Sequence, residues 1–273
     1  FSLLVWIITI LAALLTAASF VYLVLYILIK GVPYLRPELF SWTYDSNNVS
    51  MLPSIINTFL LTALSLVISV PLGIFAAIYM VEYAKKGNRI VKFIRVTAET
   101  LSGIPSIVYG LFGMIFFVGV LKMQLSLLSG SLTVAIMVLP TIMRTTEEAL
   151  LSVPQSYREG SFGLGAGKLR TVFRIVLPSA VPGILSGVIL ATGRIVGETA
   201  ALIYTAGTMA KVPNNLFASA RTLSVHMYLL SNEGLHTNEA FATAVVLLVF
   251  VMLINMLANF VARRLSAKNA END

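Results

Sequence analysis

The sequence predicts an all-α integral membrane protein with six transmembrane helices. Three observations carry this prediction: 58% of the 273 residues are hydrophobic, only 11% are charged, and the mean hydropathy is +0.89. A soluble domain carries about 25% charged residues, so this chain has too few of them to cover a water-facing surface. Inside a bilayer the backbone has no water to bond, and long apolar runs therefore form helices. Soluble globular and disordered proteins are excluded.

Six apolar runs are long enough to cross a membrane, because a hydrocarbon core about 30 Å thick requires about 20 helical residues. They are Phe1–Ile29, Leu52–Val81, Leu101–Leu121, Met123–Met143, Ser179–Ala210 and Phe241–Ala262. The fifth run is the only one that contains charged residues. In the long external stretch between the last two runs, residues 216–230 predict a short helix at the membrane surface.

The distribution of Lys and Arg predicts the orientation of the chain. Twelve of these residues lie in stretches 82–99 and 152–178 and in the C-terminal tail, whereas the three other connections contain five. Positively charged connections stay in the cytoplasm, so both termini are expected there. The chain then divides into a first helix with its external loop, a core of five helices and a cytoplasmic tail: 1–54, 55–260 and 261–273.

The cytoplasmic stretch 152–178 predicts two short helices joined by a sharp turn. Two alternative capping-box patterns, Ser152 with Gln155 and Ser156 with Glu159, predict the start of the first helix. Four glycines then permit the turn. The second helix has an apolar and a basic face, and Pro178 and Pro182 are expected to separate it from the fifth span. Such a unit is typical of a docking surface at the inner face of the membrane.

A spaced motif within this stretch supports docking. Glu159-Gly160-Ser161 is followed after three residues by Gly165, and after nine more by Ile175-Val176-Leu177-Pro178. The spacing resembles the cytoplasmic signature of permease subunits of bacterial ABC importers, with Gly-Ser in place of Ala-Ala. The resemblance implies the type I (MetI-like) permease fold, with a coupling helix that inserts into a groove on a separate ATPase subunit. The implied docking residues are Glu159, Gly160, Ser161, Phe162, Leu164 and Gly165.

The same glycines do not form a nucleotide site. In a P-loop the first glycine would fall at Phe162, and Leu169 would be Ser or Thr. The chain has no cysteine and only two histidines, and it contains no nucleophile–base or metal-binding pattern. We therefore predict no catalytic residue, metal site or cofactor in this chain, and we expect ATP and Mg to bind to the partner ATPase.

One arginine lies within the fifth predicted span, and another directly follows the inner end of the fourth. Arg144 precedes Glu147 and Glu148, and Arg194 precedes Glu198 by four residues. Because a charge at the centre of a membrane helix costs at least about 2.5–3.5 kcal/mol, Arg144, Arg194 and Glu198 are candidates for a substrate pathway. A guanidinium matches tetrahedral oxyanions, and Glu198 would accept a hydrogen bond from protonated phosphate. Alternatively, each Arg–Glu pair neutralises itself along its helix.

The residues around these charges narrow the family. Gly193–Leu202, with Tyr204-Thr205-Ala206, and Gly103–Gly110 resemble the two permease subunits of phosphate ABC importers. The resemblance extends over nearly the whole chain and implies inward transport of inorganic phosphate across a bacterial or archaeal cell membrane. It also implies a second permease subunit, two copies of an ATP-binding subunit and an external phosphate-binding protein. The fifth-span residues resemble the PstA type of permease subunit, and its sister type PstC has a similar Arg–Gly-Glu-Thr stretch.

Other functions also fit parts of this pattern. An importer of molybdate, tungstate or sulfate would keep the same arginines. A proton-coupled secondary carrier would use Glu198 as its proton site and require no ATPase. A membrane-embedded enzyme is disfavoured because no catalytic constellation is present. A nucleic-acid partner is not expected, since the net charge of +7 is explained by cytoplasmic connections of a membrane protein.

Overall fold

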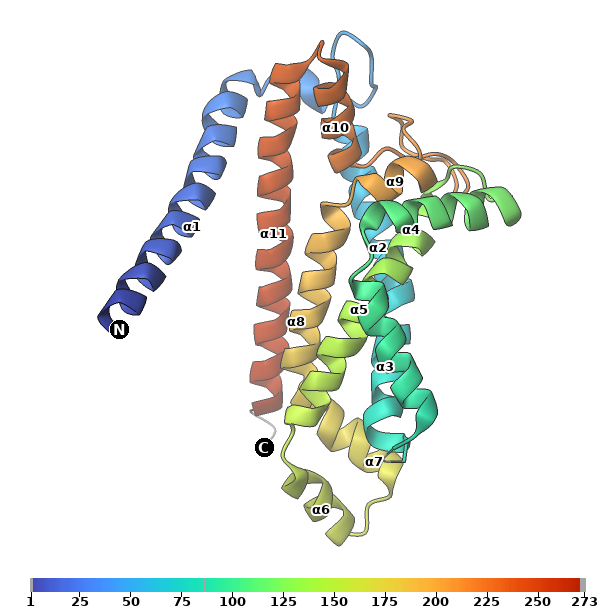
Figure 1. Cartoon of the computed structure of the whole chain (residues 1–273). Coiled ribbons are helices and arrows are strands. Elements are labelled where there is room, and N and C mark those ends of the chain that lie inside the picture. The colour runs from blue at the N-terminus through green and yellow to red at the C-terminus, as the bar shows by residue number, and fades with distance from the viewer. Residues whose placement is uncertain (1, 86, 271–273) are drawn as a thin grey trace.

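The computed structural model describes residues 2–85 and 87–270, and within them it contains helices and no strand. The long helices α2, α5, α8 and α11 run side by side and form a bundle, with α6 at one end and α10 at the other (Figure 1). The α-helices are α1 Ser2–Gly31, α2 Leu52–Ile78, α3 Arg89–Ser102, α4 Ser106–Gly113, α5 Leu127–Ser152, α6 Gln155–Gly163, α7 Lys168–Thr171, α8 Leu177–Val196, α9 Ala200–Thr205, α10 Leu223–Glu233 and α11 Thr237–Ala270.

Short helical turns complete these elements. Two 3₁₀ turns lie in the first loop, and three π-helical turns continue or precede the long helices. They are η1 Val32–Tyr34, η2 Pro37–Phe40, η3 Tyr79–Tyr83, η4 Met114–Val120 and η5 Val172–Val176. Helix α1 begins, and α11 ends, toward the end of the bundle that carries α6 (Figure 1).

Within the described residues, five helices are long and apolar enough to cross a membrane, and a bent pair makes a sixth span if it is counted as one. The five are Leu3–Tyr34, Leu52–Tyr83, Leu127–Ser152, Lys168–Val196 and Thr237–Ala258. The prediction of an all-helical membrane protein is confirmed, and its six spans correspond to these five helices and the bent pair.

The third predicted span, Leu101–Leu121, is not a single straight helix. Helix α3 ends at Ser102, and α4 with η4 continues at an angle of 105° to it. Pro105 precedes α4 in an extended conformation, because proline fixes its own φ and disfavours helix in the residue before it. Part of the predicted 82–99 connection is therefore the amphipathic helix α3, which packs beside α5.

The fifth span differs from its prediction at both ends. Pro178 and Pro182 do not separate it from the amphipathic segment, since Lys168–Val196 is one continuous helix that includes η5. Pro178 directly follows the π-helical turn η5, a local irregularity that accommodates it within the continuous helix. The helix then ends at Val196 rather than near Ala210, so Glu198 lies beyond it.

Two local predictions also need correction. Neither capping box forms: Pro154 precedes α6 without a side-chain cap, and the Ser152 hydroxyl donates to the Ala149 carbonyl instead. The interfacial helix predicted at 216–230 occurs as α10, shifted toward the C-terminus. Lys86 and residues 271–273 of the predicted tail lie outside the described residues, and the division into 1–54, 55–260 and 261–273 stays a prediction.

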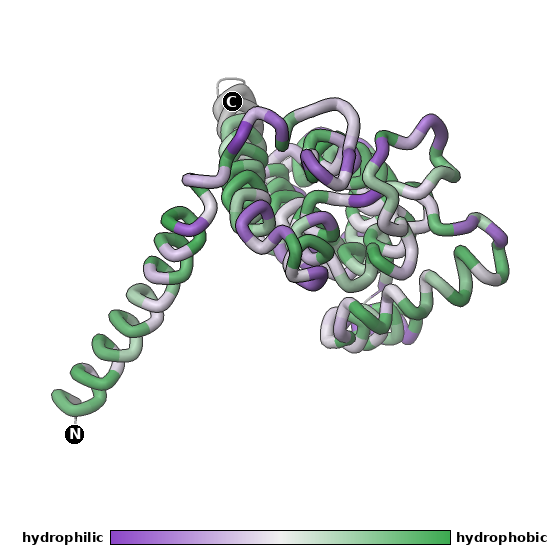
Figure 2. Tube along the Cα trace, turned by 90° about the horizontal axis from the view of Figure 1, so that it is seen from above, coloured by the Kyte–Doolittle hydropathy of each residue, from purple (hydrophilic) through white to green (hydrophobic). Residues whose placement is uncertain are grey.

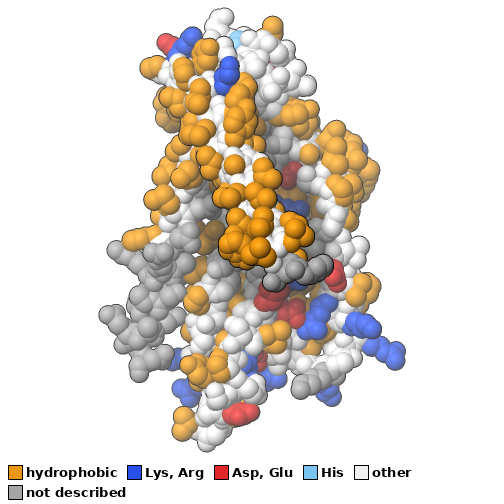
Figure 3. Space-filling view, turned by 60° about the vertical axis from the view of Figure 1, so that its left-hand side comes forward, with side chains coloured by type: hydrophobic (Ala, Val, Ile, Leu, Met, Phe, Trp, Pro, Cys, Tyr) orange, Lys and Arg blue, Asp and Glu red, His pale blue; other side chains and the backbone are white. Residues whose placement is uncertain are grey.

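The bundle is held by hydrophobic clusters at different heights. One joins α2, α5 and α8 near the α6 end, one lies farther along the bundle between α4, α5, α8 and α9, and one lies under the loops around α10. Helix α1 contacts α11 near its C-terminal end and otherwise extends away from the bundle (Figure 2). Most of its large apolar side chains are exposed. Hydrophobic side chains cover much of the face in Figure 3, whereas charged side chains gather mainly at the α6 end.

Candidate functional site

The turn at the end of α6 presents apolar side chains to solvent. Leu164 is 91% exposed and Phe162 is 46% exposed, and Glu159 is exposed as well. Gly165 adopts a φ of +82°, a left-handed conformation that glycine adopts without strain, and this reverses the chain after α6. An exposed leucine and phenylalanine at the end of a protruding helix form a surface that a partner can cover.

The small residues of the motif have different surroundings. Gly160 faces open space, and a Cβ built there would meet nothing within 4 Å. Ser161 instead is buried, and its hydroxyl lies 2.8 Å from that of Thr171 in α7. Ser161, which the sequence assigned to the docking surface, therefore faces the chain itself and ties α6 to α7.

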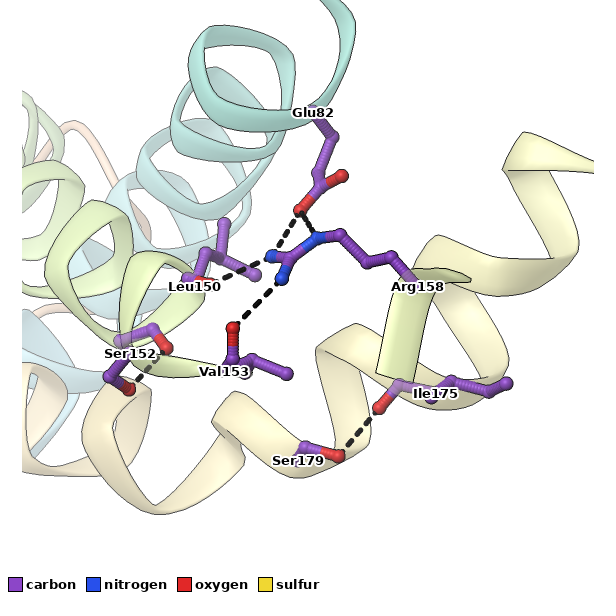
Figure 4. A network of polar contacts seen from close by, with 8 residues as sticks. Glu82, Leu150, Ser152, Val153, Arg158, Ile175 and Ser179 are labelled. Carbon is purple, nitrogen blue, oxygen red and sulfur yellow. Dashed lines mark hydrogen bonds and ion pairs between the residues drawn. The ribbon is translucent and has the colours of Figure 1, made fainter. Parts of the chain in front are cut away.

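The base of α6 is fastened by a buried arginine that the sequence analysis did not select. Arg158 is 8% exposed, and two of its guanidinium nitrogens lie 3.1 and 2.7 Å from Glu82 Oε1 (Figure 4). The guanidinium also donates to the backbone carbonyls of Leu150 and Val153, each at 2.9 Å. These carbonyls lie at the C-terminal end of α5, which lacks helical partners and attracts a cation.

This contact set joins α6 to the end of α5, which directly precedes it in the sequence, and to η3 at the end of α2, which is distant in sequence. Removing one partner of a buried ion pair leaves the other uncompensated, at a cost of about 3–5 kcal/mol. In the sequence, Arg158 counted only as a positive charge of a cytoplasmic connection, and Glu82 only as the end of a span. Their separation of 76 residues left no local signal that they pair.

The first candidate for the pathway, Arg144, borders a charged cavity between α3 and α5. Its Nε lies 3.1 Å from Glu148 Oε1, so the self-neutralising pair that was one alternative does form here. Glu147 pairs instead with Arg95 of α3, at 2.5 Å. The cavity has a volume of about 400 Å³. The sequence could not show that Arg95 approaches Glu147, since it placed Arg95 in a loop.

The second candidate, Arg194, lies in the last turn of α8 and is half-buried. In the described part of the chain it forms no ion pair with Glu198, because the helix ends between them. The Glu198 carboxylate is buried and accepts a hydrogen bond from the Ala201 backbone N–H, at 3.0 Å. Its backbone carbonyl accepts one from Ser224 Oγ, at 2.6 Å. Self-neutralisation along one helix is therefore wrong for this pair.

The surroundings of Arg194 come from the bent third span. Arg194 interacts electrostatically with Tyr109, which is buried in α4 and donates its hydroxyl proton to the Leu101 carbonyl, at 2.7 Å. Gly110 allows α4 to approach α9 closely, since a Cβ there would lie 2.7 Å from Ala201 Cα. Tyr109 of the bent span thus lies within electrostatic range of Arg194, and the adjacent Gly110 brings α4 against the segment that binds the Glu198 carboxylate.

The glycines of α8, which are Gly183, Gly187 and Gly193, differ in what they contact. Added Cβ atoms at Gly183 and Gly187 would collide with Ala149 and Thr145 of α5, so these two glycines permit packing within the chain. Gly193 has nothing within 4 Å of the corresponding position. Unlike Gly183 and Gly187, Gly193 is therefore not required for close packing within this chain.

At the opposite end of the bundle, the partly exposed Arg221 contacts the buried His226 rather than a carboxylate. The Arg221 Nη1 lies 3.2 Å from His226 Nδ1, and its guanidinium stacks 5.0 Å from the centre of the Tyr44 ring. Arginine only donates, so Nδ1 accepts and the imidazole proton lies on Nε2. Burial, and secondarily the Arg221 charge, lowers the pKa of His226 from 6.5 to about 3. The imidazole is neutral at physiological pH.

Within residues 2–85 and 87–270, no group of three or more His, Asp or Glu side chains is arranged to bind a metal ion. The charged side chains that the fold brings together form ion pairs or bind backbone groups. The candidate site residues form two groups. One is the exposed end of α6, and the other consists of Arg144, Arg194 and Glu198 along the bundle.

Comparison with known proteins identifies relatives of the chain. Residues 69–270 match the family described as binding-protein-dependent transport system inner membrane component. The chain is 34% identical to the probable ABC transporter permease protein YqgI of Bacillus subtilis (strain 168), over 96% of this chain and 95% of that protein. It is 35% identical to the phosphate transport system permease protein PstA 1 of Mycobacterium tuberculosis (strain CDC 1551 / Oshkosh), over 72% and 66% of the two chains.

The fold also occurs among solved structures. A chain in the crystal structure of a bacterial alginate ABC transporter, in complex with an alginate pentasaccharide-bound periplasmic protein, matches with a TM-score of 0.68. The two chains are 18% identical, and the match covers 94% of this chain and 95% of that one. At this level of identity the likeness establishes the arrangement of helices.

Proposed function

Because this chain belongs to the family of binding-protein-dependent transport system inner membrane components, we propose that it is a permease subunit of an ATP-driven importer of inorganic phosphate. It forms the translocation pathway together with a second permease subunit. Two copies of an ATP-binding subunit and an external phosphate-binding protein complete the complex. The chain spans the cell membrane several times, with both termini in the cytoplasm.

The single observation that carries the substrate assignment is the state of Arg194. Its guanidinium lies at the end of a membrane helix, half-buried and without a carboxylate partner among the described residues. A guanidinium in a medium of low polarity requires an anion or hydrogen-bond acceptors, and its planar fork matches two oxygens of a tetrahedral oxyanion. A phosphate ion passing this point would supply them.

Glu198 assists in the same place. Its carboxylate is held by the Ala201 N–H, three residues farther along, which fixes its position beyond the end of α8. A carboxylate accepts a hydrogen bond from the hydroxyl of hydrogen phosphate and repels an anion that has no hydroxyl, so Arg194 and Glu198 together favour protonated phosphate over sulfate. The name of the Mycobacterium relative, a phosphate transport permease, supports the same substrate.

Arg144 takes the second position of the pathway. Its charge is compensated by Glu148, so it binds an anion more weakly than Arg194 does. Weak binding at the later position suits release into the cytoplasm, because conduction requires that the ion leave as readily as it enters.

The exposed end of α6 docks on the ATP-binding subunit. Phe162 and Leu164 provide apolar contacts, Glu159 a charged one, and Gly160 and Gly165 allow close approach. Ser161 acts indirectly by holding α6 against α7. ATP with Mg binds to the partner, and this chain has no ATPase site of its own.

Uptake of radiolabelled phosphate by the complete complex in proteoliposomes tests the proposal. We expect uptake to require the ATP-binding subunits, ATP and the external binding protein, and to resist a tenfold excess of sulfate, molybdate or tungstate, in line with anion selectivity by hydrogen bonding. Competition by one of these anions would reassign the substrate. Uptake driven by a pH gradient without ATP would identify a secondary carrier and contradict the proposal.

A further inference from the structure

We propose that Arg158 and Glu82 form a positioning link that transmits movement of α6 to the ends of α2 and α5. The inference rests on the proposed function, since it assigns a role to residues beside the docking surface. Arg158 and Glu82 belong neither to the docking surface nor to the substrate pathway, but they connect the helices that carry these two sites.

The geometry fits a rigid connection. The guanidinium uses three nitrogens, two of them on Glu82 Oε1 and two on separate backbone carbonyls, with Nη2 shared between the two partners. Arginine holds its donors in one plane, so four contacts at 2.7–3.1 Å from three elements fix the orientation of α6 relative to α2 and α5 (Figure 4).

A second connection leads from the same helix to α8. Ser161 bonds to Thr171, and α7 continues through η5 into α8 as one helix. Lys168, at the start of α7, also lies 5.1 Å from the centre of the Tyr83 ring, next to Glu82. Helix α6 therefore holds both the helix that carries Arg144 and the one that carries Arg194, while its far end stays exposed.

Stability alone does not account for an ion pair at this place. Replacing a buried pair by apolar side chains of similar size is often neutral or stabilising, and the hydrophobic cluster of α2, α5 and α8 lies directly beside it. An apolar contact is not directional, so it does not fix the orientation of one helix relative to another. A charged pair with backbone contacts resists sliding and carries a displacement from one helix to the next.

The test compares uptake with ATP hydrolysis in the complete reconstituted complex. The variants are E82Q, R158K and R158Q, and the matched control is R89Q, an exposed arginine at the start of α3 with no ion pair among the described residues. We expect copurification of the ATP-binding subunit to persist in all of them. We expect phosphate taken up per ATP hydrolysed to fall about 2- to 30-fold in E82Q and R158Q, the range of mutations that weaken coupling.

R158K keeps the positive charge but lacks the planar guanidinium, so its ratio of phosphate taken up to ATP hydrolysed should lie between those of R158Q and the unchanged chain. R89Q should not alter the ratio. A ratio unchanged in both E82Q and R158Q would overturn the link, as would loss of the ATP-binding subunit in R158Q, which would make Arg158 a docking residue.

Hydrogen exchange of α6 in the same complexes provides a second measurement. We expect amides of residues 155–163 to exchange faster in E82Q and R158Q than in R89Q, because the base of the helix is released. Equal exchange in all variants would contradict the link even if uptake changed. If the unchanged complex failed to couple ATP to phosphate uptake while exchange responded as expected, the proposed function would fail and the structural link would remain.

Discussion

Arg158 and Arg194 show two different ways in which this fold accommodates an arginine. Arg158 is buried, paired with Glu82 and bound to two carbonyls, whereas Arg194 is half-buried, with no ion pair or hydrogen bond among the described residues. A buried charge whose ion-pair and hydrogen-bond partners come from the protein has a structural role. A charge that lacks such partners is available to bind a ligand. The difference separates the part of the chain that transmits movement from the part that meets the substrate.

The substitution R194Q tests the open arginine most directly and carries the largest expected effect. Hydrogen bonds to charged groups contribute about 1.5–3 kcal/mol, so phosphate uptake should fall about 10- to 100-fold while the complex still assembles. Uptake of labelled phosphate in proteoliposomes, with subunit copurification measured in parallel, checks this. R144Q is the matched variant, and its loss should be smaller because Glu148 already compensates that charge. Normal uptake by R194Q would remove Arg194 from the pathway.

The sequence identified Arg194 because a charge in an apolar run is a visible anomaly. It could not identify Arg158, because a charged residue in a polar loop is ordinary and its partner lies 76 residues earlier. The same limit applies to Arg95, whose partner Glu147 lies on a different helix, α5. Burial of a charge is a property of the packed chain, and only the fold reveals it.

Most of the helical pattern follows from apolar composition, which requires no knowledge of contacts. The errors occur where a local signal competes with tertiary packing. Pro178 and Pro182 are helix breakers in isolation, but a π-helical turn before the first of them and the packing of α8 keep the helix continuous. Ser161 carries the docking motif in the sequence, yet its hydroxyl bonds to Thr171, which faces inward.

The double substitution F162A/L164A tests the contrast within α6, between its fastened base and its exposed end. Truncating a central apolar contact costs at least about 2 kcal/mol, so the affinity of the ATP-binding subunit should fall about 30-fold or more. Copurification of that subunit over a range of concentrations measures the change. The control F93A removes an exposed phenylalanine from α3, outside the coupling loop, and should leave the affinity unaltered. Equal binding by F162A/L164A would place the docking surface elsewhere.

Arg221 extends the comparison, because its neighbour is a neutral imidazole rather than a carboxylate. The folded pKa of His226 is about 3 and the unfolded value 6.5, so below pH 6.5 the unfolded chain binds a proton that the folded chain does not. Stability should therefore decrease as the pH falls from 6.5 toward 3, by about 1.4 kcal/mol per unit. Between pH 7 and pH 5 this amounts to about 2 kcal/mol.

The substitution H226Q keeps an acceptor for Arg221 and removes the titration, so thermal unfolding of the purified complex should lose that part of its pH dependence. H236Q is the matched control, since His236 is less buried and lies 3.9 Å from Glu239. It should retain the pH dependence of the unchanged chain. If H226Q and the unchanged chain respond equally to acid, His226 is protonated in the folded state. The arginine beside it would then face a second positive charge, and the open position of Arg194 would no longer be exceptional among the arginines of this fold.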